Sequence, residues 1–92
     1  MSRKDVEKFR KAELKSAIKE SGLDREAFKS MFDLKGFGGH ELLDRTSIVS
    51  SMLDDVILNH PAALLNAELY EQATKASKAL AKLYQMVGDA TA

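Results

Sequence analysis

The sequence lacks cysteine altogether and contains a single proline among its 92 residues. Without cysteine the chain can form no disulfide, no thiolate nucleophile and no cysteine-bound metal site. Because small secreted domains usually depend on disulfides, we expect a cytoplasmic location. No run of about 18 apolar residues is present that could span a membrane, and the charged first ten residues do not have the pattern of a signal peptide. We therefore expect no membrane partner.

An excess of charge of one sign is also lacking, because 14 basic residues balance 14 acidic ones. The distribution is uneven, however: residues 1–36 contain 10 Lys and Arg against 7 Asp and Glu, whereas residues 37–92 contain 4 against 7. The resulting net charges of +3 and −3 would help two copies to dock head to tail, or would direct the first half toward an acidic surface. Small domains also acquire such a split by chance.

What the sequence does contain is the periodicity of amphipathic helices, interrupted by glycine, aspartate and proline. It predicts an all-α fold, a small bundle of three to four helices in one domain, 1–92. The predicted helices span about 2–21, 25–35, 41–58 and 62–87. The last two should form an antiparallel hairpin, with the first two as a shorter unit across it. The residues expected to start or end these helices are Ser2, Gly22, Asp24, Gly36, Pro61 or Asn66, and Gly88.

The segment 41–58 has the widest set of apolar residues, so we expect it to be the most buried helix. Before it, Phe37-Gly38-Gly39-His40 is expected to be an irregular loop that reverses the chain, with Phe37 packed on the core. Alternatively, Phe37 is an exposed anchor for a protein partner, since aromatic residues are enriched at binding hot spots.

The clearest pattern is an apolar stripe in the last third of the chain. Its members are Leu65, Leu69, Ala73, Ala76, Leu80, Leu83 and Val87. They are three or four residues apart, so all lie on one side of a helix. Alanine lets another helix approach closely, so the stripe predicts a packing seam, either within one chain or between two chains. As an interface, its main residues would be Leu69, Ala73, Ala76, Leu80 and Leu83.

In the first helix, Arg10 and Glu13 interrupt an apolar face to which Phe9 and Leu14 belong. They are three residues apart and can pair with each other. Polar residues in a helical seam often specify a partner rather than add stability, which would place this part of the helix against another chain. The alternative is that both side chains extend into water at the edge of the protein.

The first helix also carries five lysines on one stripe, at Lys4, Lys8, Lys11, Lys15 and Lys19. Such a stripe suits phosphate contacts, which require charge rather than a defined geometry. Glu7 and Glu20 reduce the positive potential, and no aromatic side chain lies between the lysines to stack on bases. A solvated face is the simpler interpretation, and a nucleic acid is the alternative partner.

Residues 13–35, ELKSAIKESGLDREAFKSMFDLK, resemble the helix–glycine–helix segment of GapR-like bacterial nucleoid proteins. The shared features are Gly22-Leu23-Asp24, Ala27-Phe28-Lys29 and Leu34-Lys35. The resemblance implies a small, helical, oligomeric DNA-binding protein, with phosphate contacts from Lys15, Lys19, Arg25, Lys29 and Lys35. It covers about a quarter of the chain. The Gly-Gly-His segment, the acidic second half and the zero net charge depart from that family.

Residues that carry catalytic chemistry are sparse. His40, Glu41 and Asp44 form an H-E-x-x-D string, but a zinc hydrolase motif needs a second histidine one helical turn away. His60, at the far end of the predicted helix, is expected to contact the last helical carbonyls. We therefore expect no metal, no cofactor and no small-molecule substrate.

Together these features predict a non-enzymatic interaction or assembly module of phage or bacterial type. Its partner would be a second copy of the chain, giving a homo-oligomer, or another protein. Nucleic-acid binding through the lysine stripe is the alternative function.

Overall fold

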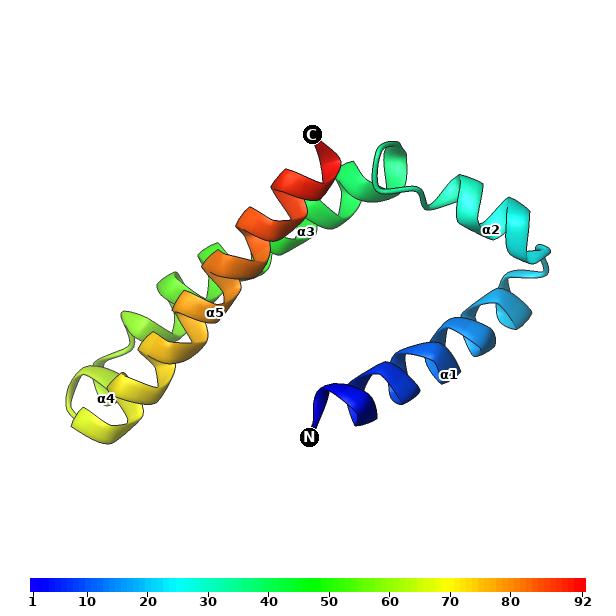
Figure 1. Cartoon of the computed structure of the whole chain (residues 1–92). Coiled ribbons are helices and arrows are strands. Elements are labelled where there is room, and N and C mark those ends of the chain that lie inside the picture. Colours follow the sequence, from blue (N-terminus) through cyan, green and yellow to red (C-terminus); the bar gives the residue numbers. More distant parts are fainter. The chain divides into compact units, whose positions relative to one another are not determined.

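The computed structural model describes all 92 residues and contains no strand, so the predicted all-α fold is confirmed. The chain divides into two units, Met1–Asp33 and Leu34–Ala92, and each is described by itself. The prediction of a single domain, with the first two helices across the hairpin, stays a prediction. The elements are α1 (Arg3–Ser21), α2 (Arg25–Met31), α3 (Phe37–Met52), the π-helical turn η1 (Leu53–Leu58), α4 (Pro61–Leu64) and α5 (Ala67–Thr91) (Figure 1).

Local signals at the helix ends build the N-terminal unit. The Ser2 hydroxyl accepts a hydrogen bond from the Asp5 amide at 3.2 Å, and the Asp24 carboxylate accepts one from the Ala27 amide at 2.8 Å. Both are N-caps, which satisfy backbone amides that lack a partner in the first turn. Between the two helices, Gly22 has a φ of 73°, the left-handed conformation that ends α1. All three expected boundary residues are therefore confirmed.

The second helix is shorter than predicted. α2 ends at Met31 rather than near residue 35, and Phe32 has left the helical conformation with φ −111° and ψ 26°. The rings of Phe28 and Phe32 contact each other with centroids 4.9 Å apart in a tilted arrangement. The helix stops early because residues 34–36 form the turn that leads into α3.

α3 begins at Phe37, so the prediction of an irregular loop over residues 37–40 is wrong. Gly38 and Gly39 lie in the first turn of the helix. A Cβ atom on Gly39 would lie 1.8 Å from the carbonyl oxygen of Leu34, so no other residue fits there without moving the backbone. Gly39 thus permits a close approach between backbone segments. The sequence had suggested only that this glycine helps to reverse the chain.

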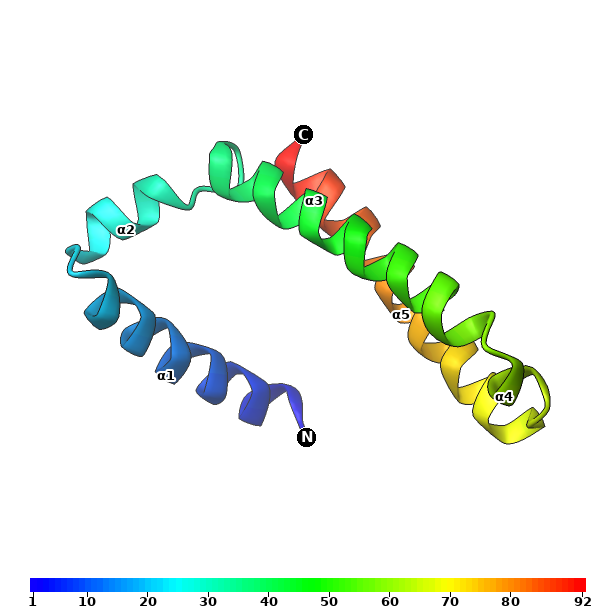
Figure 2. The same cartoon turned by 180° about the vertical axis from the view of Figure 1, so that it is seen from behind.

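α3 and α5 lie side by side and antiparallel, which confirms the predicted C-terminal hairpin (Figure 1 and Figure 2). Two contacts define how the helices align. The Ser77 hydroxyl donates to a carboxylate oxygen of Asp54 at 2.7 Å, and a Cβ atom on Gly88 would lie 3.7 Å from the Leu43 side chain. In both pairs the residue numbers add up to 131, so residues that share this total lie at the same height along the hairpin.

α3 continues into η1 without a break, but the hydrogen bonding changes there. The Asn59 amide donates to the Asp54 carbonyl at 3.2 Å, a bond across five residues instead of four. This π-helical pattern widens the turn at the end of the hairpin that is closed by α4.

Two helices replace the single one predicted over 62–87. Pro61 is the first residue of α4 and Asn66 is the N-cap of α5, so both expected starting residues are used. α5 continues through Gly88 to Thr91, and the predicted end at Gly88 is wrong. A glycine inside a helix costs about 1 kcal/mol relative to alanine, which the surrounding helix can tolerate.

The contact between α3 and α5 uses mainly small and polar residues. Val87 is the one buried large apolar side chain, and Thr46 is the one buried polar side chain, each 6% exposed. We call the recurrent covered positions the seam; they are Gly39, Leu43, Thr46, Ser50 and Leu53, with Ala73, Ser77, Leu80 and Val87. The helix over 41–58 has the largest share of covered residues among the four predicted helices, as expected, although most of its large apolar side chains are exposed.

Candidate functional site

A set of exposed apolar side chains lies along one side of the hairpin. On α3 each of these side chains belongs to the residue just before a covered residue, as Leu42 precedes Leu43. The same holds for most of them on α5, where Met86 precedes Val87. One position is a rotation of about 100° around a helix axis. Antiparallel helices that face each other turn in opposite senses when viewed from one end. The same rotation therefore carries both sets to the same side of the hairpin.

We call this side the apolar face. The exposed fraction of its large side chains runs from 46% for Leu42 and Leu83 to 60% for Val56 and Leu69. Its members are Leu42, Val49, Met52, Val56, Ile57, Leu69, Ala76, Ala79, Leu83 and Met86. Contiguous exposed apolar surface of this kind is uncommon on a soluble monomer unless it is a binding site.

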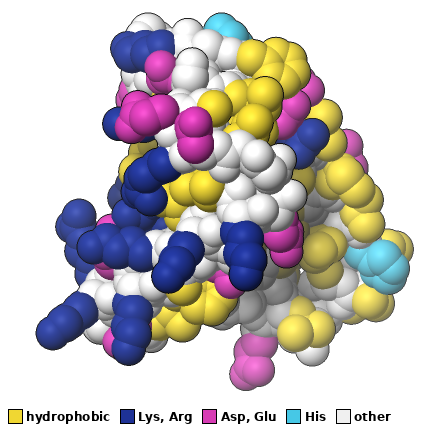
Figure 3. Space-filling view, turned by 90° about the vertical axis from the view of Figure 1, so that its right-hand side faces the viewer, with side chains coloured by type: hydrophobic (Ala, Val, Ile, Leu, Met, Phe, Trp, Pro, Cys, Tyr) yellow, Lys and Arg dark blue, Asp and Glu magenta, His cyan; other side chains and the backbone are white.

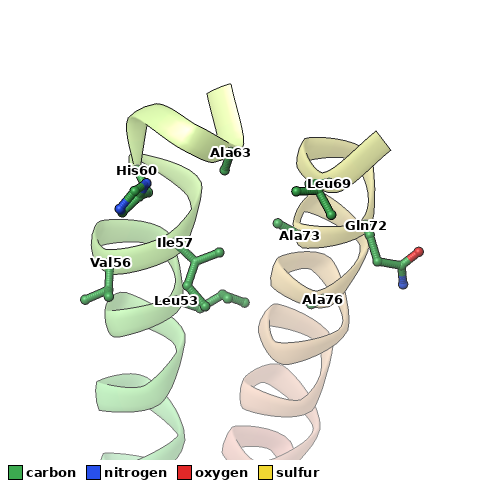
Figure 4. Close-up of a pocket in the computed structure, with 9 residues that line it drawn as sticks. All are labelled: Leu53, Val56, Ile57, His60, Ala63, Leu69, Gln72, Ala73 and Ala76. Atoms are coloured by element: carbon green, nitrogen blue, oxygen red, sulfur yellow. The ribbon is translucent and has the colours of Figure 1, made fainter. Parts of the chain in front are cut away.

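Near α4 the apolar face is hollowed into a groove of about 630 Å³ between η1 and α5 (Figure 4). Leu53, Ile57 and Leu69 point into the space between the two helices. Val56 and Gln72 lie at its outer edges and point away from it. The groove therefore extends the apolar face rather than forming a separate polar pocket.

His60 is the one ionisable residue that lines this groove. Its Nδ1 accepts a hydrogen bond from the Ala62 amide at 3.0 Å. The His60 side chain therefore caps the start of α4. Its backbone amide donates to the Ile57 carbonyl at 3.1 Å, so the expected contact with the last carbonyls of the preceding helix is made by the backbone. No group of three or more His, Asp or Glu side chains lies close enough together to hold a metal ion. The groove offers a partner apolar contact, with no arrangement for acid–base or nucleophilic chemistry.

The predicted stripe of α5 is divided between two environments. Its members Ala73, Leu80 and Val87 are covered in the seam. The members Leu65, Leu69, Ala76 and Leu83 are exposed, the last three of them on the apolar face. The sequence predicted that the whole stripe is one seam, because that prediction used the spacing of apolar residues alone. The missed signal was Ser77, a small polar residue that follows Ala73 at the same helical spacing and donates a hydrogen bond to Asp54 of η1.

Arg10 pairs with Glu7, so the predicted pairing with Glu13 is wrong. The Arg10 guanidinium donates to both carboxylate oxygens of Glu7. These hydrogen bonds lower the pKa of the Glu7 carboxyl and raise the pKa of Arg10. Arg10 and Glu13 are both exposed in the N-terminal unit. Their role at an interface with another chain stays a prediction.

Phe37 is 71% exposed at the first position of α3. The expectation that it packs on the core is wrong, because the chain enters the helix at this residue instead of looping back over the hairpin. Its exposure fits the alternative, an anchor for a protein partner, which stays a prediction.

The five lysines of the first helix lie on one stripe, because α1 is uninterrupted from Arg3 to Ser21. None of them forms an ion pair. Figure 3 shows Lys and Arg side chains gathered over part of the surface in this view. Lys4, Lys8 and Lys11 line one shallow hollow of this surface together with Asp5 and Glu7. The stripe is therefore a positive surface whose potential is reduced by neighbouring carboxylates, because Lys11 also acts electrostatically on Glu7.

The helix–glycine–helix form expected from the resemblance of residues 13–35 is present as α1, Gly22 and α2. That form follows from the local helix caps, so the DNA-binding role implied by the resemblance stays a prediction. No helix is long and apolar enough to cross a membrane. Compared with known proteins, the chain matches no family model, no curated protein and no solved structure.

Proposed function

We propose that this protein is a non-enzymatic interaction module that binds a protein partner through the apolar face of the α3–α5 hairpin. The observation that supports the proposal is that the seam buries fewer large apolar side chains than the apolar face leaves exposed. The seam buries one large apolar side chain, Val87, whereas the apolar face leaves eight exposed. Covering apolar surface contributes about 25 cal/mol for each Å² removed from water, so a partner gains most by binding there.

The opposite side of the hairpin supports the same proposal by contrast. Most residues one position after the seam are polar, and they include Asp44, Ser47, Ser51, Asp54, Thr74 and Lys78. A hairpin that was solvated on both sides would be polar on both sides. This hairpin has one side suited to water and one side suited to another protein surface.

The experiment compares two substitutions at neighbouring positions of α3. Val49→Glu places a charge on the apolar face, and Ser51→Glu places the same charge on the polar side. The tagged full chain is recovered from cells that also express an untagged copy, and the bound proteins are quantified by mass spectrometry. Val49→Glu should lose the bound proteins and Ser51→Glu should keep them, with equal helix content by circular dichroism. If Val49→Glu keeps every bound protein, the proposal is wrong.

Nucleic-acid binding is a second candidate, supported by the five lysines of α1 that lack ion pairs. Binding of a labelled duplex and a labelled single strand is followed by fluorescence anisotropy between about 50 and 200 mM salt. Replacing Lys8 and Lys11 by glutamine should reduce the salt slope by about 0.9 for each lost phosphate contact to a duplex. Lys75→Gln is the control, since Lys75 lies on α5 beside Glu71. An absence of binding at the lowest salt would exclude this function.

A further inference from the structure

We infer that the partner on the apolar face is a second copy of this chain, and that two hairpins pack face to face as a four-helix bundle. This inference rests on the proposed function and deepens it by naming the occupant. It makes the interface isologous, so the same residues of both copies meet across a two-fold axis. The area, the alignment and the charge of the apolar face each favour a second copy.

The first argument is the area available. α3 and η1 together have 22 residues and α5 has 25. At about 1.5 Å per residue these helices are roughly 33–37 Å long, and packed helix axes lie about 8–10 Å apart. Each helix contributes a strip about as wide as this spacing, so the two strips of the hairpin cover on the order of 600 Å² per copy. Two copies cover about 1,200 Å², which reaches the lower end of stable protein interfaces.

The second argument is how the residues align. A two-fold axis parallel to the helices places α3 of one copy over α5 of the other, with residues of equal height opposite each other. Met52 then faces Ala79 of the second copy, because their numbers share the total set by the Ser77–Asp54 contact. A long side chain over an alanine fills the space between helices without a void. Val49 likewise lies within one residue of the height of Leu83, so both ends of this contact are apolar.

The third argument is charge. Arg45 is the charged residue that interrupts the α3 part of the apolar face, and it lies 3.5 Å from Glu41. Its side chain is 71% exposed, and the same alignment places it opposite Met86 of the second copy, where its long side chain can extend into water beside the interface and stay close to Glu41. A second copy therefore covers the apolar residues without burying an unpaired charge, which would be costly.

The test measures the mass of the full chain by analytical ultracentrifugation over a concentration series. The expected result is a monomer–dimer equilibrium that stops at the dimer, because a two-fold interface is closed. Met52→Glu should weaken the dimer at least tenfold, and Leu83→Glu should do so from the other helix. Ser51→Glu, on the polar side, should dimerise like the unaltered chain. Circular dichroism establishes that each variant is helical.

Cross-linking tests the alignment without relying on a charge in the interface. The natural chain has no cysteine, so single-cysteine variants form disulfides only at the chosen positions. Mixing Met52→Cys with Ala79→Cys should give mainly the mixed disulfide dimer on mild oxidation. Disulfides between two Met52→Cys copies at equal or higher yield would overturn the parallel two-fold axis.

A monomer at every concentration would overturn the inference, as would a mass above the dimer. If the inference of a dimer fails in this way, the unfolding free energy of Met52→Glu shows whether the proposed function fails as well. If the monomeric variant is as stable as the unaltered chain, the apolar face is free and awaits a different protein, and the proposed function stands. If the variant is less stable, the chain covers this face itself, and both ideas fail.

Discussion

Glycines in this protein do three different things, and the neighbouring atoms decide which. Gly22 adopts a positive φ and ends α1. Gly39 admits the backbone of Leu34 at a distance that no side chain allows. Gly88 lies inside α5 with ordinary space around it. The sequence predicted helix ends at Gly22 and Gly88 and a chain-reversing loop at Gly39, and only Gly22 was assigned correctly. The distinction depends on contacts with atoms outside the glycine's own helix, the Leu34 carbonyl for Gly39 and the Leu43 side chain for Gly88, which the pattern of residue types does not show.

Alanine substitutions at two of these glycines should have opposite effects on stability. Gly39→Ala should lower the free energy of unfolding, because the new Cβ would lie 1.8 Å from the Leu34 carbonyl oxygen. Gly88→Ala should raise it by up to about 1 kcal/mol, because alanine favours the helix and the site has room. Urea unfolding followed by circular dichroism measures both. Equal effects of the two substitutions would contradict this account of Gly39.

The Glu7–Arg10 pair gives a second prediction at the scale of single residues. In Arg10→Gln, the pKa of the Glu7 carboxyl should rise toward its usual value of 4.5, since the hydrogen bonds that lower it are lost. NMR titration of the Glu7 side chain measures this shift, with Arg25→Gln as the control. Because the pKa is lowered in the folded chain, the pair supports α1 above pH 4.5, and this support is lost as the pH falls through the lowered pKa. An unchanged Glu7 pKa in Arg10→Gln would show that the pair is not formed in solution.

At the scale of elements, the starts of α1, α2 and α5, which have side-chain caps, could be predicted from the sequence, whereas the uncapped start of α3 and the ends of α2 and α5 could not. Ser2, Asp24 and Asn66 each bond an amide within their own first turn, so a local reading finds them. The end of α2 depends on the turn that follows it, and the end of α5 is held beside α3. The same reason explains the seam: Ser77 was overlooked because its partner, Asp54, is 23 residues away.

The N-cap of α5 can be tested directly. The Asn66 side chain accepts a hydrogen bond from the Leu69 amide at 3.0 Å, so Asn66→Ala should cost about 1 kcal/mol of unfolding free energy. Asn59→Ala is the matched control, because the Asn59 side chain makes no hydrogen bond. Denaturant unfolding of the two variants under the same conditions gives the comparison. A cost for Asn59→Ala as large as that for Asn66→Ala would argue against capping as the cause.

At the scale of the whole molecule, the hairpin was predictable and the surface that it leaves exposed was not. The periodicity of α5 indicated a helix with an apolar side. It could not show which residues of that side are covered by α3 and which are left exposed. Apolar residues such as Leu69 and Leu83 count equally toward a core and toward an interface. The structure separates them, because Ala73 and Leu80 are covered and Leu69 and Leu83 are not.

A dimer through the apolar face should make stability depend on protein concentration. The unfolding midpoint should rise as the concentration increases, because association favours the folded state by mass action. In Met52→Glu the midpoint should stay constant over the same range. Thermal unfolding monitored by circular dichroism measures this at several dilutions. A constant midpoint in the unaltered chain would rule out a dimer that forms only when the chain is folded.

The hydrogen bond from Asn59 to Asp54 has a consequence for the length of the chain. A π-helical turn holds one residue more than an α-helix needs to reach the same height. One residue of η1 is therefore supernumerary, and a chain without Asp55 would continue α3 as a regular helix up to the same loop. Shortened in this way, the hairpin would keep the alignment between Leu43 and Gly88 but would rotate Ile57 relative to α5. Because Val56, Ile57 and His60 line the groove beside α4, this deletion should change the shape of the groove.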